Sequence, residues 1–437
     1  MQIDRREILK RGFQFSVAAG ASSTLGAGSE ASAILEPQQQ PDRRALSQAF
    51  EKLKPLGDRV KPITVDEMKE RIALAQKLMT DAKPQYAALF MAPGSSMYYY
   101  SGIRWGGGER LFALTIPRKG DPFIVCPAFE EGRARELLKW PIEVRVWQED
   151  ESPYTLVAKA LGERGFRSGT IGVEEQTRFF FYDGLRKAAG GMQLVSGDPI
   201  TIGCRGRKTA HELELMYLAN EATIDVLRAV FASLREGQTQ REVAGMVSQG
   251  FQRMGLGGGG LVLFGEWAAL PHGTTQPQRL AEGQVVLIDV GTSVEGYASD
   301  ITRTGVLGRP SAKASKAFEV LRQAQEAALK AAVRGKTCGS VDDAARRVVT
   351  SNGYGKLYEI FTHRVGHGIG LDGHEHPYLV RGSKVVLEPG MTFSDEPGIY
   401  ERGDYGVRLE DIIAIEPEGP ARLLTPGLSH SLEKPCG

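Results

Sequence analysis

The chain has 437 residues, of which 41% are hydrophobic, enough to bury the core of one large domain or of two. Lys and Arg number 54 against 53 for Asp and Glu, so a net charge of +1 gives no reason to expect nucleic acid or an anionic membrane as a partner. The four cysteines are widely spaced and form no CxxC pair, which argues against a zinc-finger or redox motif and favours small buried apolar residues.

The first residues of the chain resemble a bacterial twin-arginine export signal. Arg5 and Arg6 stand before an Ala/Gly/Ser-rich run, and the sequence ASA at 31–33 has the small side chains of a cleavage site. We therefore predict a signal peptide over 1–33 and a periplasmic or extracellular protein, with an amphipathic surface helix as the alternative. No later segment is apolar for about 18 residues, so we expect a soluble mature protein without a membrane anchor.

The segments that follow predict a linker and then an α/β domain. Residues 34–63 are rich in Gln, Pro and charge, which favours an extended lead-in, and 64–82 has the acidic first turn and apolar spacing of a helix. Up to residue 204, short apolar runs bounded by Gly and Pro alternate with helical patterns, which is typical of an α/β fold. The expected strands are 86–91, 110–117, 122–127 and 169–174, and the expected helices are 128–139 and 154–165.

The remaining residues, 205–437, contain a weak internal repeat. Residues 210–253 predict two helices, and strands that include 284–291 and 297–307 follow them. Residues 312–352 again predict two helices, followed by strands that include 391–400 and 407–417. Two such halves, packed sheet against sheet with helices outside, would form a pseudo-symmetric α+β sandwich with a central cleft.

Carboxylates interrupt four of the apolar strand patterns in this second domain. A buried carboxylate without a partner is costly, so each requires a cation or a proton. A hairpin that turns near 294–295 would place the first two roughly opposite each other, in one cleft. A salt-bridged or surface group is the plainer interpretation of any one of them alone, whereas the set points to metal. These carboxylates are Asp289, Asp300, Glu396 and Glu410.

A histidine cluster lies in the same domain. The stretch THRVGHGIGLDGHEHP, 362–377, is rich in both histidine and glycine, and histidine binds metals and carries protons near neutral pH. His367 in GHGIG could supply a fifth ligand, because its glycine neighbours permit a close approach that bulky side chains would block. Four carboxylates and one imidazole match two divalent ions, because four negative charges offset four positive ones and oxygen ligands suit Mn, Fe, Co or Zn.

These motifs resemble the creatinase/prolidase/aminopeptidase P group of metallopeptidases, family M24, which has the pita-bread fold. The resemblance rests on the order Asp, Asp, His, Glu, Glu and on the strings HGIGLDGHE, EPGIY and VRLED. It implies an α+β protein with a pita-bread catalytic domain and a smaller creatinase-like α/β N-terminal domain. It also implies two divalent metal ions per subunit, Mn2+ first, with Co2+, Zn2+ or Fe2+ possible. The implied ligands are Asp289, Asp300, His367, Glu396 and Glu410.

The resemblance implies roles for five residues around such a centre. Two metals could hold a bridging water as hydroxide and polarise the scissile carbonyl, while Glu396 takes the water's proton and passes it to the leaving nitrogen. His272 and His374 are candidates to stabilise the tetrahedral intermediate or to bind the prolyl part and carboxylate of the substrate, and His363 to shape that pocket. Arg408 could orient the ligands, or it could be a surface arginine of a strand.

The implied function is a dinuclear metal-dependent exopeptidase that hydrolyses Xaa-Pro bonds, as an Xaa-Pro aminopeptidase or an Xaa-Pro dipeptidase. Its substrate would be a small peptide with proline in the second position, and a homodimer or homotetramer is expected by analogy. Two alternatives remain open: a hydrolase or lyase that acts on other substrates with the same site, and a metal-free creatinase-like hydrolase or binding protein.

Overall fold

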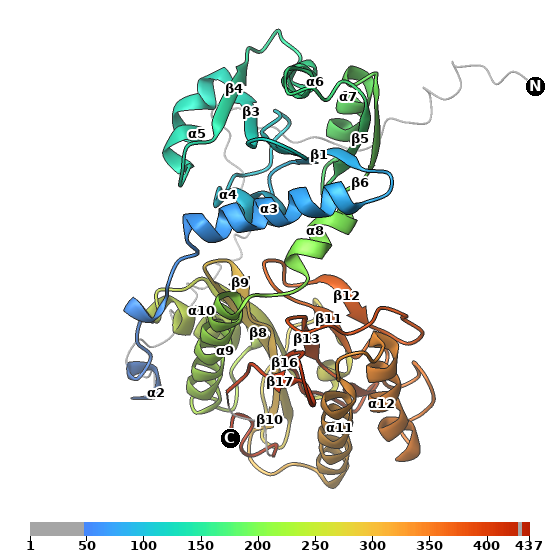
Figure 1. Cartoon of the computed structure of the whole chain (residues 1–437). Coiled ribbons are helices and arrows are strands. Elements are labelled where there is room, and N and C mark those ends of the chain that lie inside the picture. The colour runs from blue at the N-terminus through green and yellow to red at the C-terminus, as the bar shows by residue number, and fades with distance from the viewer. Residues whose placement is uncertain (1–47, 427–430) are drawn as a thin grey trace, which may run out of the picture. The chain divides into compact units, whose positions relative to one another are not determined.

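The structure is a computed structural model that describes residues 48–426 and 431–437 (Figure 1). The predicted export signal, 1–33, lies outside the described residues. Within the described ranges, no helix combines the length and the apolar character needed to cross a lipid bilayer. All four cysteines are buried and unpaired, which confirms their prediction as small apolar core residues.

The first domain is built on a six-stranded sheet with the order β4-β3-β2-β1-β5-β6. β1 lies at its centre, is buried at every position, and pairs antiparallel with β2 and parallel with β5. Apolar side chains on both faces of β1 pack into two separate clusters, as expected for a strand covered on both sides. The strands are β1 (Tyr86–Met91), β2 (Ala113–Pro117), β3 (Phe123–Pro127), β4 (Glu143–Trp147), β5 (Gly169–Val173) and β6 (Met192–Ser196).

Helices surround this sheet. The N-terminus of α3 is fixed by a capping box, in which the Thr64 hydroxyl accepts from the backbone N–H of Glu67 and the Glu67 carboxylate accepts from that of Thr64. Sequence patterns predicted α3, α5 and α6, but not α4, α7 and α8. The helices are α3 (Val65–Asp81), α4 (Ser95–Ser101), α5 (Glu131–Leu137), α6 (Pro153–Glu163), α7 (Phe179–Ala188) and α8 (Asp198–Arg205).

The segment before α3 was predicted to be an extended lead-in, but part of it is folded and packed. It contains α2 (Gln48–Glu51) and a short 3-10 helix, Gly57–Arg59. Phe50 is fully buried and belongs to the core cluster of the second domain, with Leu53 and Leu56. These three apolar side chains pack on residues that are distant in sequence, and composition does not reveal such contacts. The prediction of an extended conformation is therefore wrong for this stretch.

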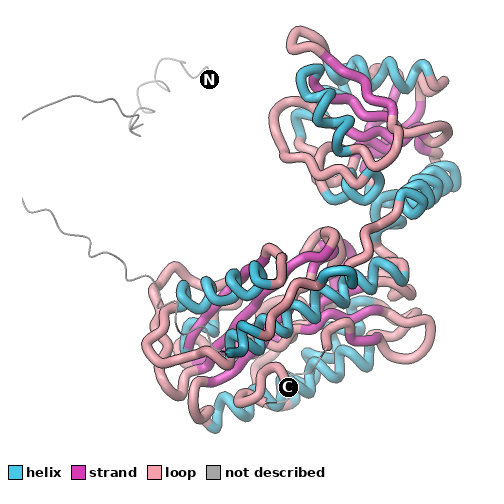
Figure 2. Tube along the Cα trace, turned by 90° about the vertical axis from the view of Figure 1, so that its left-hand side faces the viewer, coloured by secondary structure: helices cyan, strands magenta, loops and turns pink. Residues whose placement is uncertain are grey.

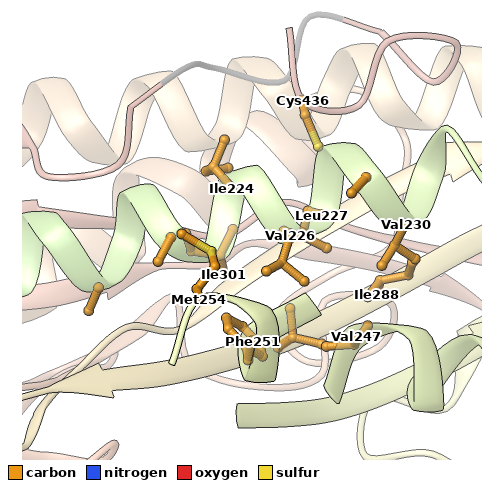
Figure 3. Packing of buried hydrophobic residues seen from close by; sticks show 14 of the residues in the cluster. Ile224, Val226, Leu227, Val230, Val247, Phe251, Met254, Ile288, Ile301 and Cys436 are labelled. Atoms are coloured by element: carbon orange, nitrogen blue, oxygen red, sulfur yellow. The ribbon is translucent and has the colours of Figure 1, made fainter. Parts of the chain in front are cut away.

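The second domain has the predicted order of helix, helix and strands in each half. In the first half, α9 (Ala210–Phe231) and α10 (Gln240–Arg253) pack on a sheet of order β10-β8-β7, with β9 paired to β8. Figure 3 shows Val230 of α9 and Val247 of α10 near Ile288 of β8. The strands are β7 (Gly258–Phe264), β8 (Val285–Val294), β9 (Tyr297–Ala298) and β10 (Ile301–Val306).

In the second half, α11 (Ala312–Ala331) and α12 (Cys338–Ser351) pack on strands that form a five-stranded sheet, β12-β11-β13-β16-β17, and a hairpin, β14-β15. The strands of the domain lie between its helices (Figure 2). These strands are β11 (Gly366–Gly368), β12 (Glu375–Leu379), β13 (Thr392–Asp395), β14 (Gly398–Glu401), β15 (Tyr405–Arg408), β16 (Asp411–Ala414) and β17 (Arg422–Leu423).

Of the four carboxylates predicted to lie within strands, only one does. Asp289 is inside β8, whereas Asp300 lies between β9 and β10, Glu396 follows β13, and Glu410 lies between β15 and β16. The backbone leaves the regular ladder at these points: the N–H of Glu410, for example, donates to the carbonyl of Thr302. The prediction of four strand carboxylates is therefore wrong for three of them, which sit at strand ends.

Candidate metal centre and active site

A β-hairpin brings Asp289 and Asp300 onto one face. The register of β8 and β10 places Asp289 opposite Thr302, and the turn between β8 and β9 contains Glu295 and Gly296, both with positive φ. Asp300 is two residues before Thr302, so it lies diagonal to Asp289 on the same face of the ladder. The predicted hairpin is present, with the two aspartates offset by one diagonal step.

A second hairpin does the same for Glu396 and Glu410. β14 and β15 pair Gly398 with Arg408, and each glutamate lies two residues beyond that pair on its own arm. The two carboxylates therefore converge at the open end of the hairpin. The side chains of both line a cavity of about 550 Å3 that also contains Asp289 and Asp300.

His367 completes this group from β11. Its Nδ1 lies 3.0 Å from the carbonyl of Gly368 and donates to it, so the lone pair of Nε2 faces the carboxylates. Nε2 lies 3.3 Å from Glu396, 3.8 Å from Asp300 and 3.9 Å from Glu410. Burial, and then the neighbouring imidazole of His374, lower the pKa of His367 to about 3, so the ring is neutral.

A glycine is needed beside this histidine. A Cβ at Gly366 would lie 1.9 Å from the carbonyl oxygen of Ser394 on the adjacent strand. Only glycine allows β11 to approach β13 closely enough for His367 to reach the carboxylates. The glycine-rich GHGIG string is therefore a packing requirement of the site.

The carboxylates of the cluster are buried close together, so their charged forms require a nearby cation. Burial raises the pKa values of Asp300 and Glu410 well above the usual carboxyl range, and neighbouring carboxylates add to both shifts. Burial likewise raises the pKa of Glu396 to about 7, against a lowering by Arg408. Carboxylate oxygens and an imidazole lone pair that face one another are donors for cations, and four carboxylates with one histidine suit a pair of divalent ions.

Potential ligand atoms come within 4.8 Å of one another in three overlapping groups of three residues. Each group contains at least two of the five predicted ligands, and His374 joins one of them. Shared members link the groups into one cluster large enough for two ions. The groups are Asp289, Asp300 and Glu410; His367, Glu396 and Glu410; and Asp300, His367 and His374.

Arg408 is buried beside this cluster and orients two of its carboxylates through hydrogen bonds. It is 3% exposed, and its guanidinium donates to Asp289 Oδ2 at 2.5 Å and to Thr302 Oγ1 at 3.1 Å. Thr302 Oγ1 in turn donates to Glu410 Oε2 at 2.7 Å. One buried arginine thus orients a carboxylate from each half of the domain, and the alternative of a surface arginine is wrong.

His363 lies beside the cluster as a neutral ring with both nitrogens occupied. Nδ1 donates to the carbonyl of Arg364 at 2.8 Å, and Nε2 accepts from the hydroxyl of Tyr400 at 2.7 Å. Burial, and then the charge of Arg408, lower the pKa of His363 to about 3. Because no ring N–H remains for a substrate, His363 can shape the pocket wall, as predicted, but cannot donate to a reacting group.

His272 and His374 line the same cavity with more exposed side chains. The ring of His374 stacks on that of His367 with 3.6 Å between centroids, and its Nδ1 lies 3.3 Å from Nη2 of Arg364. Because a guanidinium only donates, Nδ1 is the acceptor and the proton of neutral His374 is on Nε2. Burial, followed by the charge of Arg364, lowers the pKa of His374, which favours this neutral form.

Ion pairs tie the loop that carries His374 to α8. Arg205 bonds to Asp372 at 2.6 Å and to Glu375 at 2.9 Å, and Lys208 bonds to Glu375 at 2.6 Å. Glu375 is 8% exposed, so these charges are largely shielded from solvent. The loop is therefore fixed on both sides of His374.

The remaining histidines are outside the cluster. His211 is at the start of α9 and contacts Glu67, His376 lines a separate small pocket, and His430 is outside the described residues. Sequence reasoning did not assign roles to Thr302, Tyr400 or Arg364, which the structure places in contact with predicted site residues. Tyr400 stands within the EPGIY string and Arg364 directly after His363, so only their neighbours in sequence hinted at them.

Four carboxylates and a neutral imidazole that converge between two helix-helix-strand halves define a metal-dependent hydrolase. The chain belongs to metallopeptidase family M24, whose model matches residues 214–417, and the model of the creatinase/prolidase N-terminal domain matches residues 71–206. These matches confirm the predicted family, the two-domain fold class and a metallo-exopeptidase, and enzymes of this family are dinuclear.

Similar proteins cover most of the chain. An Xaa-Pro dipeptidase of Lactobacillus helveticus is 35% identical over 74% of this chain and 88% of its own length. The crystal structure of dipeptidase PepE from Mycobacterium ulcerans has a TM-score of 0.77 and 34% identity over 84% of this chain and 97% of that one. A recombinant prolidase from Thermococcus sibiricus has a TM-score of 0.74 and 31% identity, and covers 82% of this chain and 96% of its own.

Proposed function

We propose that this protein is a dinuclear metal-dependent exopeptidase that hydrolyses the Xaa-Pro bond of small peptides. The observation that carries the proposal is the convergence of five potential ligands on one cavity of about 550 Å3, a volume suited to a small molecule. Relatives whose names specify an Xaa-Pro dipeptidase and a prolidase support proline in the second position. The proposed ligands are Asp289, Asp300, His367, Glu396 and Glu410.

Two divalent cations at these residues would supply Lewis-acid activation of the scissile carbonyl and of the attacking water. Glu396 is the proposed base, because it is 15% exposed at the cavity surface and only its Oε1 is held, by Ser394. His374, protonated on Nε2, would donate to the oxygen of the tetrahedral intermediate. His272 lines the cavity and is the proposed contact for the prolyl part.

We propose Mn2+ as the metal, because an oxygen-rich donor set with one imidazole suits a hard divalent ion. Metal analysis of the purified protein and reconstitution of a chelator-treated sample with Mn2+, Co2+, Zn2+ and Fe2+ test this. Recovery of activity with Mn2+ at the lowest concentration would support it. Full activity that survives exhaustive chelation would contradict the whole metal assignment.

The substrate proposal is tested with a panel of Xaa-Pro dipeptides, longer Xaa-Pro peptides and matched Xaa-Ala peptides, with a chelated control. Cleavage of only the proline-containing members is expected. No cleavage of any peptide by metal-loaded protein would favour a non-peptide substrate at the same site.

Export by the twin-arginine pathway and assembly into a dimer or tetramer remain proposals. The first is supported by Arg5 and Arg6 and by the small residues at 31–33. Fractionation of cells that express the chain with both arginines replaced by lysine tests it, with retention in the cytoplasm as the expected result. Light scattering of the purified protein tests the second.

A further inference from the structure

A buried ion pair on α12 lies beside one wall of the cavity. Arg346 is 5% exposed and Asp342 is fully buried, and the two residues are one helical turn apart. Nε of Arg346 donates to Asp342 Oδ2 at 2.6 Å, and Nη2 donates to Oδ1 at 3.2 Å. This bidentate pairing uses two of the five N–H donors of the guanidinium.

The other three donors bind backbone carbonyls of one segment. Residues 352–365, the wall segment, connect α12 to β11 through turns and bends. Nη1 of Arg346 donates to the carbonyl of Leu357 at 2.9 Å and to that of Phe361 at 2.8 Å, and Nη2 donates to that of His363. One helical side chain thus supplies hydrogen bonds that a neighbouring strand would supply to a regular strand.

The wall segment forms part of the lining of the cavity. Tyr358, Thr362 and His363 all line it. The central carbon of Arg346 lies 4.1 Å from the centre of the Tyr358 ring and 4.3 Å from that of Phe361, two cation–π contacts. Arg346 itself lines a separate pocket, so it would act on the cavity through the wall segment rather than by contact with a substrate.

The backbone of the wall segment requires such support. Leu357 has a φ of 49°, in the left-handed region that residues with a side chain rarely adopt. A conformation of this kind costs free energy and persists only where neighbouring groups hold it. The Leu357 side chain is 51% exposed, so buried packing contributes little to its position. The hydrogen bond from Arg346 to its carbonyl supplies a restraint instead.

Asp342 connects the same pair to the proposed metal ligands. Its Oδ1 accepts from the backbone N–H of Val365 at 2.8 Å, and the carbonyl of Val365 accepts from the N–H of Glu396 at 2.7 Å. Val365 is also two residues before His367. The carboxylate therefore fixes the backbone that leads to one proposed ligand and is bonded to another.

We propose that Asp342 and Arg346 are positioning residues of the active site: Arg346 holds the cavity wall for the substrate, and Asp342 holds the backbone beside the metal ligands. This inference rests on the proposed Xaa-Pro peptidase function. A displaced wall weakens binding of the ground state and the transition state alike, so loss of the Arg346 bonds raises KM and leaves kcat nearly unchanged. Both residues act through the backbone and are not catalytic residues.

Arg346→Lys tests the first role. Lysine keeps the charge beside Asp342, but its single nitrogen cannot replace a planar fork that binds the carboxylate and three carbonyls together. With Ala-Pro and Mn2+-loaded protein, we expect KM to rise about 10-fold or more, with kcat and metal affinity within about threefold of the wild type. Arg347→Lys, at the next and exposed position of α12, is the matched control and should behave as the wild type does. Unchanged KM in Arg346→Lys would overturn the proposal.

A double variant, Asp342→Leu with Arg346→Met, tests the second role. It removes both buried charges together, so no unpaired charge remains in the interior. Because it also releases the N–H of Val365, we expect metal affinity to fall about 10-fold or more in addition to the rise in KM. Competition with a chromogenic chelator measures the affinity, and a value equal to that of the wild type would overturn the role of Asp342.

Limited proteolysis reports on the wall segment without turnover. Trypsin cleaves after lysine, and Lys356 is exposed within the segment. We expect Arg346→Lys to speed cleavage after Lys356 about 10-fold, while sites in the first domain are cleaved at the wild-type rate. Equal acceleration in both domains would indicate a general loss of stability and would overturn the proposal.

Failure of the proposed function has a different signature. In that case metal-loaded wild-type protein cleaves no Xaa-Pro peptide, and the rate of tryptic cleavage after Lys356 still decides whether Arg346 holds the wall segment. Faster cleavage in Arg346→Lys than in Arg347→Lys supports this role. An equal rate in the two variants overturns it.

Discussion

Arg408 donates a hydrogen bond of 2.5 Å from Nη2 to Oδ2 of Asp289, across two strands that belong to different halves of the catalytic domain. The same guanidinium donates to the hydroxyl of Tyr400 at 3.0 Å and, through Thr302, orients Glu410. A lysine could not make these bonds together, because it offers one nitrogen where arginine offers a planar fork. The two halves of the candidate metal centre therefore depend on a single side chain for their alignment.

We predict that Arg408→Lys weakens metal affinity about 10- to 100-fold, as is usual when a group that orients metal ligands is lost. Competition with a chromogenic chelator measures this affinity. Arg402→Lys, in the exposed turn of the same β14-β15 hairpin, is the control and should bind metal as the wild type does. Unchanged affinity in Arg408→Lys would show that the ligands are aligned without it.

Asp300→Asn should remove one proposed ligand while it keeps the shape of the side chain. A ligand that binds only the folded state at 100 times its Kd raises the free energy of unfolding by about 2.7 kcal/mol. We expect added Mn2+ to stabilise the wild type by an amount of this order, to stabilise Asp300→Asn much less, and to restore no turnover in the variant. Thermal unfolding with and without metal measures this effect, and equal stabilisation of both proteins would exclude Asp300 as a ligand.

Tyr400→Phe tests the buried link between His363 and Arg408. The hydroxyl donates to His363 Nε2 and accepts from Arg408, so its removal leaves two buried polar groups without that partner. We expect the free energy of unfolding to fall by about 1–3 kcal/mol, together with a loss of kcat/KM. Urea unfolding and steady-state kinetics measure the two effects. Tyr217→Phe, at an exposed position of α9, should alter neither.

The parts of the site that sequence reasoning predicted are those set by local structure. Asp289 and Asp300 share a face because a short turn at Glu295 and Gly296 closes a hairpin, and turn residues between alternating apolar runs are readable in a sequence. The order of the five candidate ligands carried the resemblance to the family. Local patterns therefore located the carboxylates, although strand ends, rather than strand interiors, hold three of them.

Non-local packing accounts for what was missed. Phe50 lies in a polar segment, and its burial depends on α9, which begins at Ala210. Strand β4 has charged residues, and most of its positions are only partly buried, so it shows no continuous apolar run.

The pair formed by His211 and Glu67 gives a pH-dependent prediction away from the metal centre. His211 Nδ1 lies 2.8 Å from Glu67 and Nε2 lies 2.9 Å from the carbonyl of Lys61. Both neighbours are acceptors, so only the imidazolium satisfies them together. Burial lowers the pKa of His211, but the hydrogen bonds to Glu67 and Lys61 raise it more, and the pKa ends above its usual value of about 6.5.

A pKa that is raised in the folded state contributes stability below the unfolded pKa, and this contribution is lost as pH rises through the folded pKa. His211→Gln should therefore destabilise the protein more at pH 5.5 than at pH 8.5, by less than about 1 kcal/mol because the pair is partly exposed. Urea unfolding at the two pH values measures the difference. Glu67→Gln should show the same loss at pH 5.5, since it removes the acceptor charge that favours the imidazolium, and a larger effect of His211→Gln at pH 8.5 would contradict the assignment.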